Sequence, residues 1–400
     1  MKEKTSIISQ SKVLSRVGKE YNSHPVLSKI MEETMKESIK NRISALQKVM
    51  IEKEIDAVEI MDRENLIYFT EMLDLEGATL VVSAMEEPKL ICLWLDARHA
   101  YDCTSMDVIP YFFSNERACD KTVQILNDLK VRNLKVGFTR YFINIKDFLS
   151  LKENVIGIEF YDIGEDWYKI RSVKKADEII LIKKASQFLS VGMQAAVDII
   201  APGIKENDIL TEADYAMRKA GSEGSTFRMQ VLRHDRQQLM HPYAGDFVIK
   251  NNEPVVIHLG ASYKGYTSKM CRTVFLGKVN EEVEVIYKVL IQAQSIAIDA
   301  LKPGTIAKDV FDAVYRYIHS KGYGKFFLDT IGYGVGIRQS EFYPIISRKS
   351  EHEICENMVV DLLLPSIYKP HLGGPRITDT VLVNNQNCVR LTQFEEYISK

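Results

Sequence analysis

The sequence predicts an α+β protein of two domains, and three features of the chain support this. The 400 residues, 46% of them hydrophobic, are enough to bury two separate cores. Strand and helix patterns alternate as far as about Asp162, which is typical of an α/β layer. After about residue 166, long amphipathic helices and one long β-hairpin pattern predict a domain of a different kind. We therefore divide the chain into an N-terminal extension (1–36), an α/β domain (37–165) and a larger domain (166–400).

Composition and charge argue against several classes of protein. Lysine and arginine number 52 and aspartate and glutamate 54, so a net charge of −2 disfavours a nucleic-acid partner. No apolar run reaches the roughly 18–20 residues of a membrane span, and no signal peptide is expected. The six cysteines show no C-x-x-C spacing, which favours reduced thiols over a disulfide or zinc framework. The expectation is a cytoplasmic protein with no membrane partner.

The elements of the first domain follow from short apolar patterns. A helix is predicted over 37–54, where apolar residues recur at helical spacing. Strands are expected at 55–61, 78–83 and 89–95, and a turn leads into a short helix over 62–70.

The second domain shows a repeated helix pattern. A helix that Pro202-Gly203 ends is followed by another that stops near Gly221. A strand is expected over 227–233, and two helices over 285–301 and 306–321, with apolar stripes that face the core. Pro303-Gly304 lies between the latter two helices as Pro202-Gly203 does between the former two. This echo predicts an internal two-fold repeat of helix pairs with strands.

The stretch 255–273 is the most informative one, and it predicts a β-hairpin. An apolar strand, a turn bounded by glycines and a returning strand follow one another. With Tyr263 and Lys264 as the loop, His258 pairs directly with Lys269. The imidazole and the ammonium are then expected side by side on one face of the sheet.

This hairpin resembles the metal-binding hairpin of the creatinase, aminopeptidase P, prolidase and methionine aminopeptidase family, whose pattern is V-x-x-D-x-G-x-x-x-x-G-Y-x-S-D-x-x-R-T. Further motifs match in order, from I-D-A-V-E-I-M-D-R-E-N-L-I-Y-F-T at 55–70 through G-Y-G-V-G at 332–336 and R-I-T-D-T at 376–380 to L-T-Q-F at 391–394. The resemblance covers about Asn41 to the end. It implies an N-terminal α/β domain, a C-terminal pita-bread domain of curved antiparallel sheet flanked by helices, and a homodimer.

In that family two Asp, one His and two Glu hold a pair of metal ions. The resemblance places other residues at these positions: His258, Lys269, Tyr333, Leu364 and Thr378. All four carboxylates are replaced, and an ammonium repels a dication. The alignment therefore predicts no metal and no other cofactor. Asp361 lies near the fourth position, where one extra residue leaves the register open.

Polar side chains remain at the predicted site. His241 aligns with the proton-handling His of the family, which is the acid/base in creatinase, an enzyme that works without metal. We expect His241 as acid/base and Lys269 as the cation that holds a substrate carboxylate or an oxyanion, with His258 and Tyr333 assisting. The predicted substrate contacts are Glu341, Arg376, Cys271 and His234.

Three functions stay open from the sequence. The first is a metal-independent, creatinase-like hydrolase that cleaves a C–N or related bond of a small carboxylate-bearing substrate, and a lyase fits as well. The second is a catalytically inactive relative that binds a peptide or partner in the old cleft. The third is an Xaa-Pro peptidase that still uses metal.

Several of these residues also have a structural explanation. Lys269 is then paired with Asp361 or Asp379, and Tyr333 is an aromatic plug that fills the space of the metals. Cys271 is a small buried apolar residue. Arg272 and Asp379 are expected to form structural hydrogen bonds or an ion pair.

Overall fold

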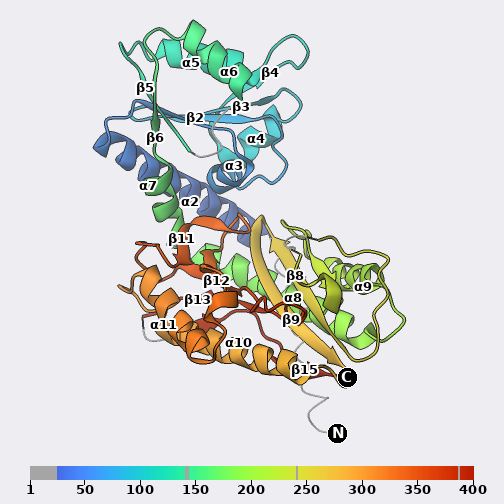
Figure 1. Cartoon of the computed structure of the whole chain (residues 1–400). Helices are drawn as coiled ribbons and strands as arrows, with labels where there is room; N and C mark the ends of the chain where they lie inside the picture. The colour runs from blue at the N-terminus through green and yellow to red at the C-terminus, as the bar shows by residue number, and fades with distance from the viewer. Residues whose placement is uncertain (1–24, 140–143, 240–241, 386–387) are drawn as a thin grey trace. The chain divides into compact units, whose positions relative to one another are not determined.

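The computed structural model describes residues 25–139, 144–239, 242–385 and 388–400 (Figure 1). The chain divides into two compact units between Gly164 and Glu165. Each unit has its own sheet and its own buried apolar side chains. Most of the predicted extension lies outside the described residues, and from Pro25 the chain is already helical.

The first unit contains a mixed six-stranded sheet of order β4-β3-β2-β1-β5-β6. The pairs β1–β2 and β2–β3 are antiparallel, and the other neighbours are parallel. The strands are β1 (Ala57–Ile60), β2 (Thr79–Ser83), β3 (Lys89–Leu93), β4 (Asp107–Tyr111), β5 (Lys135–Phe138) and β6 (Glu159–Asp162). The first three confirm the predicted strands, with shorter ends.

Helices cover both faces of this sheet (Figure 1). On one face, α5 (Ala118–Asp128) and α6 (Ile145–Asn154) bury apolar side chains against the strands. On the other lie α2 (Pro25–Glu52), α3 (Arg63–Thr70) and α4 (Ala97–Thr104), which contact one another. Asp62 caps α3 by accepting a hydrogen bond from the backbone N–H of Asn65 at 3.0 Å, so the predicted turn into a short helix is confirmed.

The second unit contains a nine-stranded sheet whose main path is β11-β10-β12-β13-β9-β8-β7. Neighbours on this path are antiparallel, while β14 pairs with β13 and β15 runs parallel to β9. The strands are β7 (Gln230–Leu232), β8 (Glu253–Tyr263), β9 (Tyr266–Leu276), β10 (Thr330–Gly334), β11 (Glu341–Ser347), β12 (Val359–Leu364), β13 (Ile377–Leu382), β14 (Val389–Arg390) and β15 (Ile398–Ser399). The long, curved β8 and β9 dominate the sheet in Figure 1.

Two helix pairs pack on the two halves of this sheet. After α7 (Gly164–Ser172), the pair α8 (Ala176–Ile199) and α9 (Glu206–Lys219) buries its apolar stripes against β7 to β9. The pair α10 (Glu281–Ala300) and α11 (Ala307–Ser320) does so against β10 to β13. These stripes face the core, as predicted.

The turns between the paired helices are built alike. Gly203 and Gly304 both have a left-handed backbone, with φ of +94° and +85°. Their N–H groups donate to Ile249 and Ile354 at 2.9 and 2.8 Å, so each turn is tied to a corresponding strand-like segment. The predicted two-fold repeat is therefore confirmed at the level of the backbone.

The predicted hairpin is confirmed, but its predicted register is wrong. The two-residue loop is Lys264-Gly265, with φ of +47° and +79°, as in a type I′ turn. His258 therefore pairs with Cys271, and Lys269 pairs with Gly260. His258 and Lys269 are diagonal neighbours on the same face, with Cα atoms typically about 7–8 Å apart.

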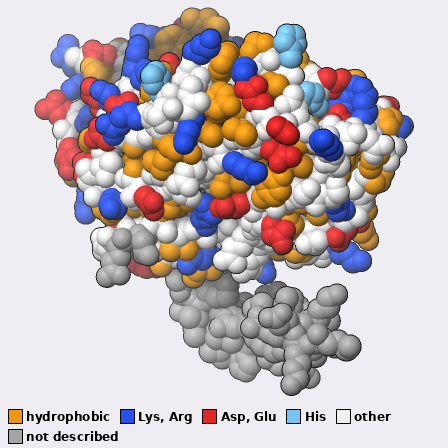
Figure 2. Space-filling model, turned by 60° about the horizontal axis from the view of Figure 1, so that its bottom comes forward, with side chains coloured by type: hydrophobic (Ala, Val, Ile, Leu, Met, Phe, Trp, Pro, Cys, Tyr) orange, Lys and Arg blue, Asp and Glu red, His pale blue; other side chains and the backbone are white. Residues whose placement is uncertain are grey.

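The face of the molecule drawn in Figure 2 mixes Lys and Arg with Asp and Glu, without a large area of one charge. This mixing accords with the net charge of −2. Within the described part of the chain, no helix combines the length and the apolarity that crossing a membrane requires.

Candidate active site

A cavity of about 430 Å³ in the second unit brings His258 and Lys269 together. Its other described walls come from β7, from the segment before it and from the loop that leads into β11: Thr226, Phe227, Arg228, Gln230, Gln339 and Ser340. The volume lies in the range of small-molecule sites, which is roughly 300–1,000 Å³. We call this space the site cavity.

Lys269 and Asp361 form a buried ion pair beside the site cavity. Lys269 Nζ contacts Asp361 Oδ2 and donates to Ser340 Oγ at 3.3 Å. The two charged side chains are 4% and 0% exposed. Burial raises the pKa of Asp361, because the carboxylate loses more from leaving water than it gains from the ammonium. Of the two structural partners considered for Lys269, the structure confirms Asp361.

Strand register explains how two residues 92 positions apart meet. Cys271 pairs with Thr378, so Lys269, two residues earlier on β9, lies opposite Thr380. Thr380 pairs with Asp361 on β12, and Asp361 in turn pairs with Tyr333 on β10. Residues in such a cross-strand row share a face of the sheet. The lysine side chain therefore spans one strand to reach the carboxylate.

An aromatic wall closes one side of the site cavity. The Phe227 ring lies 4.8 Å from the His258 ring between centroids, and Lys269 Nζ lies 5.8 Å from the Phe227 centroid. Gly260, opposite Lys269, makes room for this ring, since a Cβ at that position would lie 2.2 Å from Phe227 Cε1. Gly260 thus leaves the space that the Phe227 ring needs beside the cavity.

Tyr333 meets the site through its backbone. Its N–H donates to Asp361 Oδ1 at 3.0 Å. Burial, and then the negative charge of Asp361, raise the pKa of the Tyr333 phenol, which keeps it protonated at neutral pH. Its side chain is not among the described walls of the cavity.

The four predicted substrate contacts do not line the described cavity, and two of them are fixed by burial. Glu341 forms an ion pair of 2.8 Å with Arg171, both about 5% exposed, and so neutralises a buried guanidinium. Cys271 packs with Leu232 and Val256, and burial raises the pKa of its thiol to about 12. The structural explanation of Cys271 is therefore confirmed, and a substrate contact by either residue is not supported.

The other two support the surroundings of the cavity. Arg376 donates to Gln230 Oε1 at 3.3 Å and to the carbonyl of Gln237 at 2.6 Å, so it braces a cavity wall from behind. His234 lies in the short helix η1 (His234–Arg236) and packs closely against Gly373. His241, the predicted acid/base, lies outside the described residues.

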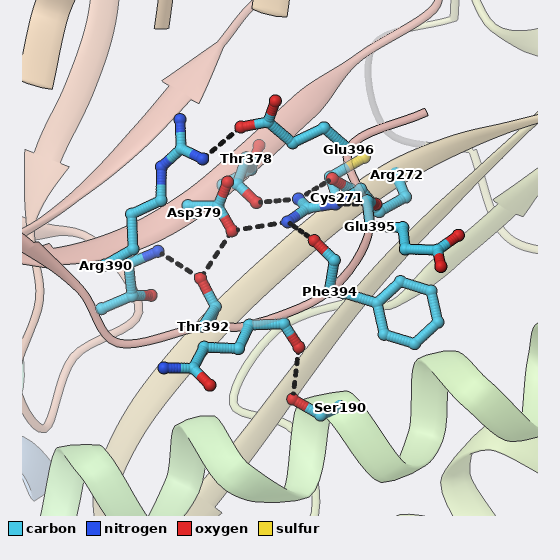
Figure 3. Close-up of polar contacts among 12 residues, drawn as sticks. Ser190, Cys271, Arg272, Thr378, Asp379, Arg390, Thr392, Phe394, Glu395 and Glu396 are labelled. Atoms are coloured by element: carbon cyan, nitrogen blue, oxygen red, sulfur yellow. Dashed lines mark hydrogen bonds and ion pairs between the residues drawn. The ribbon is translucent and has the colours of Figure 1, made fainter. Parts of the chain in front are cut away.

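The motif residues Arg272 and Asp379 form the expected ion pair. Arg272 Nη2 donates to Asp379 Oδ1 at 2.8 Å, and both side chains are almost fully buried (Figure 3). Thr392 Oγ1 donates to the same carboxylate oxygen at 2.6 Å, and Arg272 also donates to the carbonyls of Glu395 and Phe394. The network ties β9 and β13 to the C-terminal segment, so its role is structural.

The residues at the five aligned positions do not fit a pair of metal ions. Lys269 brings a positive charge that repels metal cations, and its ammonium is already paired with the Asp361 carboxylate. The carboxylates of Asp379 and Glu341, which are nearby in the fold, are paired with arginines. Among the described residues, no group of three or more His, Cys, Asp or Glu side chains is placed to hold a metal ion.

Strand pairing gives the register of β12 around the fourth aligned position. Thr378 pairs with Leu363, and Leu364 pairs with Ile377. Leucine carries no atom that binds a metal ion, at either of these two positions.

Sequence reasoning missed several walls of the cavity. Arg228 and Gln230 lay in a predicted strand of which only Gln230–Leu232 forms. Ser340 belongs to no motif, and its contact with Lys269 spans 71 positions, so no local pattern reveals it. The one usable hint was its place in the loop that follows the G-Y-G-V-G motif, because loops often carry binding and catalytic residues.

This chain belongs to the metallopeptidase family M24, whose model matches residues 180–385, just over half of the chain. A model of the creatinase/prolidase N-terminal domain matches residues 42–173. The predicted family and its two-domain pita-bread architecture are thereby confirmed.

Several relatives match over nearly their whole length. The Xaa-Pro dipeptidase of Pyrococcus furiosus is 32% identical over 357 residues, which cover 89% of this chain and 99% of the relative. The crystal structure of the prolidase from Pyrococcus horikoshii superposes with a TM-score of 0.81 at 28% identity, over 89% of this chain and 99% of that one. The X-Pro aminopeptidase from Thermotoga maritima gives a TM-score of 0.79 at 27% identity, with the same coverage.

Proposed function

We propose that this chain is a hydrolase that cleaves the amide C–N bond of small Xaa-Pro-type dipeptides in the site cavity, without a pair of metal ions. The observation that carries this proposal is the Lys269–Asp361 ion pair, which lies where the family resemblance places metal ligands. For the substrate, the names of the relatives favour the Xaa-Pro peptidase alternative over a creatinase-like substrate.

A dipeptide carboxylate needs a cation at the site cavity. The sequence suggests Lys269, but its ammonium already faces Asp361. Arg228 is better suited, because its exposed guanidinium lines the solvent side of the cavity, where it donates to the Tyr243 hydroxyl at 2.8 Å. Guanidinium groups bind carboxylates with paired hydrogen bonds. Arg228→Met should therefore raise KM for dipeptides several-fold and leave kcat nearly unchanged.

The remaining predicted roles stay part of the proposal. His258, which lines the cavity, is placed to assist by hydrogen bonding to the bound dipeptide. Tyr333 serves as a neutral hydrogen-bond donor near Asp361. His241 keeps its predicted acid/base role, on the strength of the motif alone.

A second candidate is binding of dipeptides without turnover. The specific observation behind it is the neutrality of the Lys269–Asp361 pair, which leaves no net charge at the former metal position. Such a protein would bind the same ligands through Arg228 and the cavity walls.

The test is release of proline from a panel of Xaa-Pro dipeptides, measured in EDTA and, in parallel, after incubation with Mn²⁺ and desalting. The proposal expects equal turnover in both arms. Turnover that appears only with metal would contradict it. Dipeptide binding by calorimetry without proline release would establish the binding protein instead.

A further inference from the structure

Ser340 is the hydroxyl group that the structure brings to Lys269. Its Oγ lies 3.3 Å from Lys269 Nζ, and both residues line the site cavity. Ser340 is partly exposed there, while Lys269 is 3% exposed. Asp361, fully buried, contacts the same Nζ. The Asp361 carboxylate, the Lys269 amine and the Ser340 hydroxyl thus form a row that leads from the interior to the cavity.

We propose that Ser340 is the nucleophile of an acyl-transfer mechanism, with Lys269 as its general base and Asp361 as a positioning residue. This inference rests on the proposed hydrolysis of an amide substrate. The order of acid, base and hydroxyl is that of serine hydrolases, and lysine replaces histidine as the base in Ser–Lys variants on unrelated folds. The arrangement supplies a nucleophile that belongs to the chain itself.

The base must be a neutral amine when attack begins. Asp361 and Lys269 share a site with little access to water. Burial there destabilises the charged pair relative to the neutral carboxylic acid and amine. Burial raises the pKa of Asp361, which makes proton transfer from the ammonium to this carboxylate less costly. When the proton lies on Asp361, the Lys269 nitrogen offers its lone pair to the Ser340 hydroxyl.

The reaction balances with water as the only co-reactant. Ser340 Oγ bonds to the scissile carbonyl carbon while its proton moves to Lys269 Nζ. The C–N bond then breaks, and the leaving amine takes that proton, which leaves an ester on Ser340. Water attacks the ester, gives one proton to Lys269 and releases the acid, and Lys269 returns the proton to Ser340 Oγ.

Gln339 is placed to assist this chemistry. It precedes Ser340, lines the same cavity and carries a neutral amide, a group used to stabilise oxyanions. The donor for an oxyanion is its Nε2 amide group, because Oε1 can only accept hydrogen bonds. Oε1 is buried and has no hydrogen-bond partner among the described residues.

A fluorophosphonate probe tests the nucleophile directly, since it phosphonylates activated serines without any substrate. The full chain is incubated with the probe, and the label is located by peptide mass spectrometry. We expect one label, on Ser340, that Ser340→Ala abolishes and Ser347→Ala, a control in β11, leaves unchanged. No label on Ser340, or a Ser340→Ala variant that labels like the wild type, would overturn the proposal.

The base and the positioning residue are tested through the rate of labelling. In the double variant Lys269→Met/Asp361→Leu, which avoids a lone buried charge, the rate should fall about 100-fold, the usual lower contribution of a general base. In Asp361→Asn the midpoint of the rate against pH should move to lower pH, because loss of the carboxylate disfavours the ammonium. A purely structural role of Asp361 would leave this midpoint in place.

The outcome separates this inference from the proposed function. Proline release by the wild type that survives in Ser340→Ala would keep the proposed function and overturn the serine mechanism. A label on Ser340 without proline release from any Xaa-Pro dipeptide would support the serine and overturn the proposed substrate.

Discussion

Lys269 carries its ammonium into a place that is 3% exposed, and Asp361 is the group that neutralises it. Breaking a buried ion pair on one side leaves an uncompensated charge, at a cost of about 3–5 kcal/mol. Replacing both partners with apolar side chains of similar size is often neutral. A single replacement should therefore lower the free energy of unfolding more than replacement of both partners does.

Lys269→Met should lower the free energy of unfolding by about 3 kcal/mol at pH 8, and by less at pH 5. The sign follows from Asp361, whose pKa is raised in the folded protein. A carboxyl group whose pKa is raised on folding stabilises the folded state while it is protonated. That contribution is lost as the pH rises. Urea unfolding at the two pH values measures the effect. A double variant Lys269→Met/Asp361→Leu that is as unstable as the single one would contradict this account.

Glu59, on β1 of the first unit, predicts a second pH dependence. Burial raises the pKa of its carboxyl to about 7, the nearby Thr122 hydroxyl lowers it, and the charge of Asp147 raises it further. The protonated form is favoured on folding, so its contribution is complete below pH 4.5 and lost as the pH rises through about 7. In Glu59→Gln, the urea midpoint for unfolding of the first unit should be nearly the same at pH 5 and pH 8. A wild type whose stability in the first unit does not fall over this range would contradict the prediction.

Single-residue partners were only partly predictable from the sequence. Asp361 was one of two carboxylates considered for Lys269, because both lie near the aligned metal positions. The choice between them depends on which face of β12 and β13 each occupies, and the extra residue before Pro365 concealed this. Ser340 was not predicted, since a loop residue reaches its partner through tertiary packing alone.

Among the elements, the β8–β9 hairpin shows how a register error can leave a face prediction intact. Moving the loop from Tyr263-Lys264 to Lys264-Gly265 shifts each pairing by two residues. Side chains alternate with a period of two, so His258 and Lys269 remain on the same face. The signal that would have fixed the register is Gly265, because glycine suits the second position of a type I′ turn.

Gly260→Ala should close the site cavity without unfolding the hairpin. The new methyl would lie 2.2 Å from Phe227 Cε1, so the ring must leave its place beside His258. We expect a stability loss of about 1–3 kcal/mol and at least a tenfold loss of dipeptide affinity by calorimetry. Adding Phe227→Leu should recover much of both. Unchanged affinity in Gly260→Ala would show that the aromatic wall does not shape the ligand site.

The repeat of helix pairs was predictable because its signal is local. Pro-Gly steps end one helix and open the next in both halves, and the left-handed glycines confirm equivalent turns. The strands that complete each half have weaker patterns, and the strand predicted over 227–233 shrank to three residues.

At the scale of the whole molecule, the order of motifs along the chain predicted both the family and its architecture. Each motif combines turn glycines, strand residues and charged positions, so their succession is far more specific than any one of them. The site could not be predicted in the same way, because its chemistry depends on the positions where this chain departs from the motif.

The homodimer implied by the family resemblance is a further prediction. Light scattering coupled to size exclusion should give twice the mass of the chain across the micromolar range. A monomer at every concentration would contradict it, and proline release would then have to be assigned to a single chain.

Metal content decides whether the Lys269–Asp361 pair replaces the metal ions of the family. The purified protein is incubated with Mn²⁺, Co²⁺ or Zn²⁺, desalted and analysed by elemental mass spectrometry, with an EDTA-treated sample as the control. We predict well under one equivalent of each metal, because the family resemblance places Lys269 at a ligand position and its ammonium faces Asp361. One equivalent or more, retained after desalting and absent from the control, would contradict the account and assign the chain to the metal-dependent peptidases.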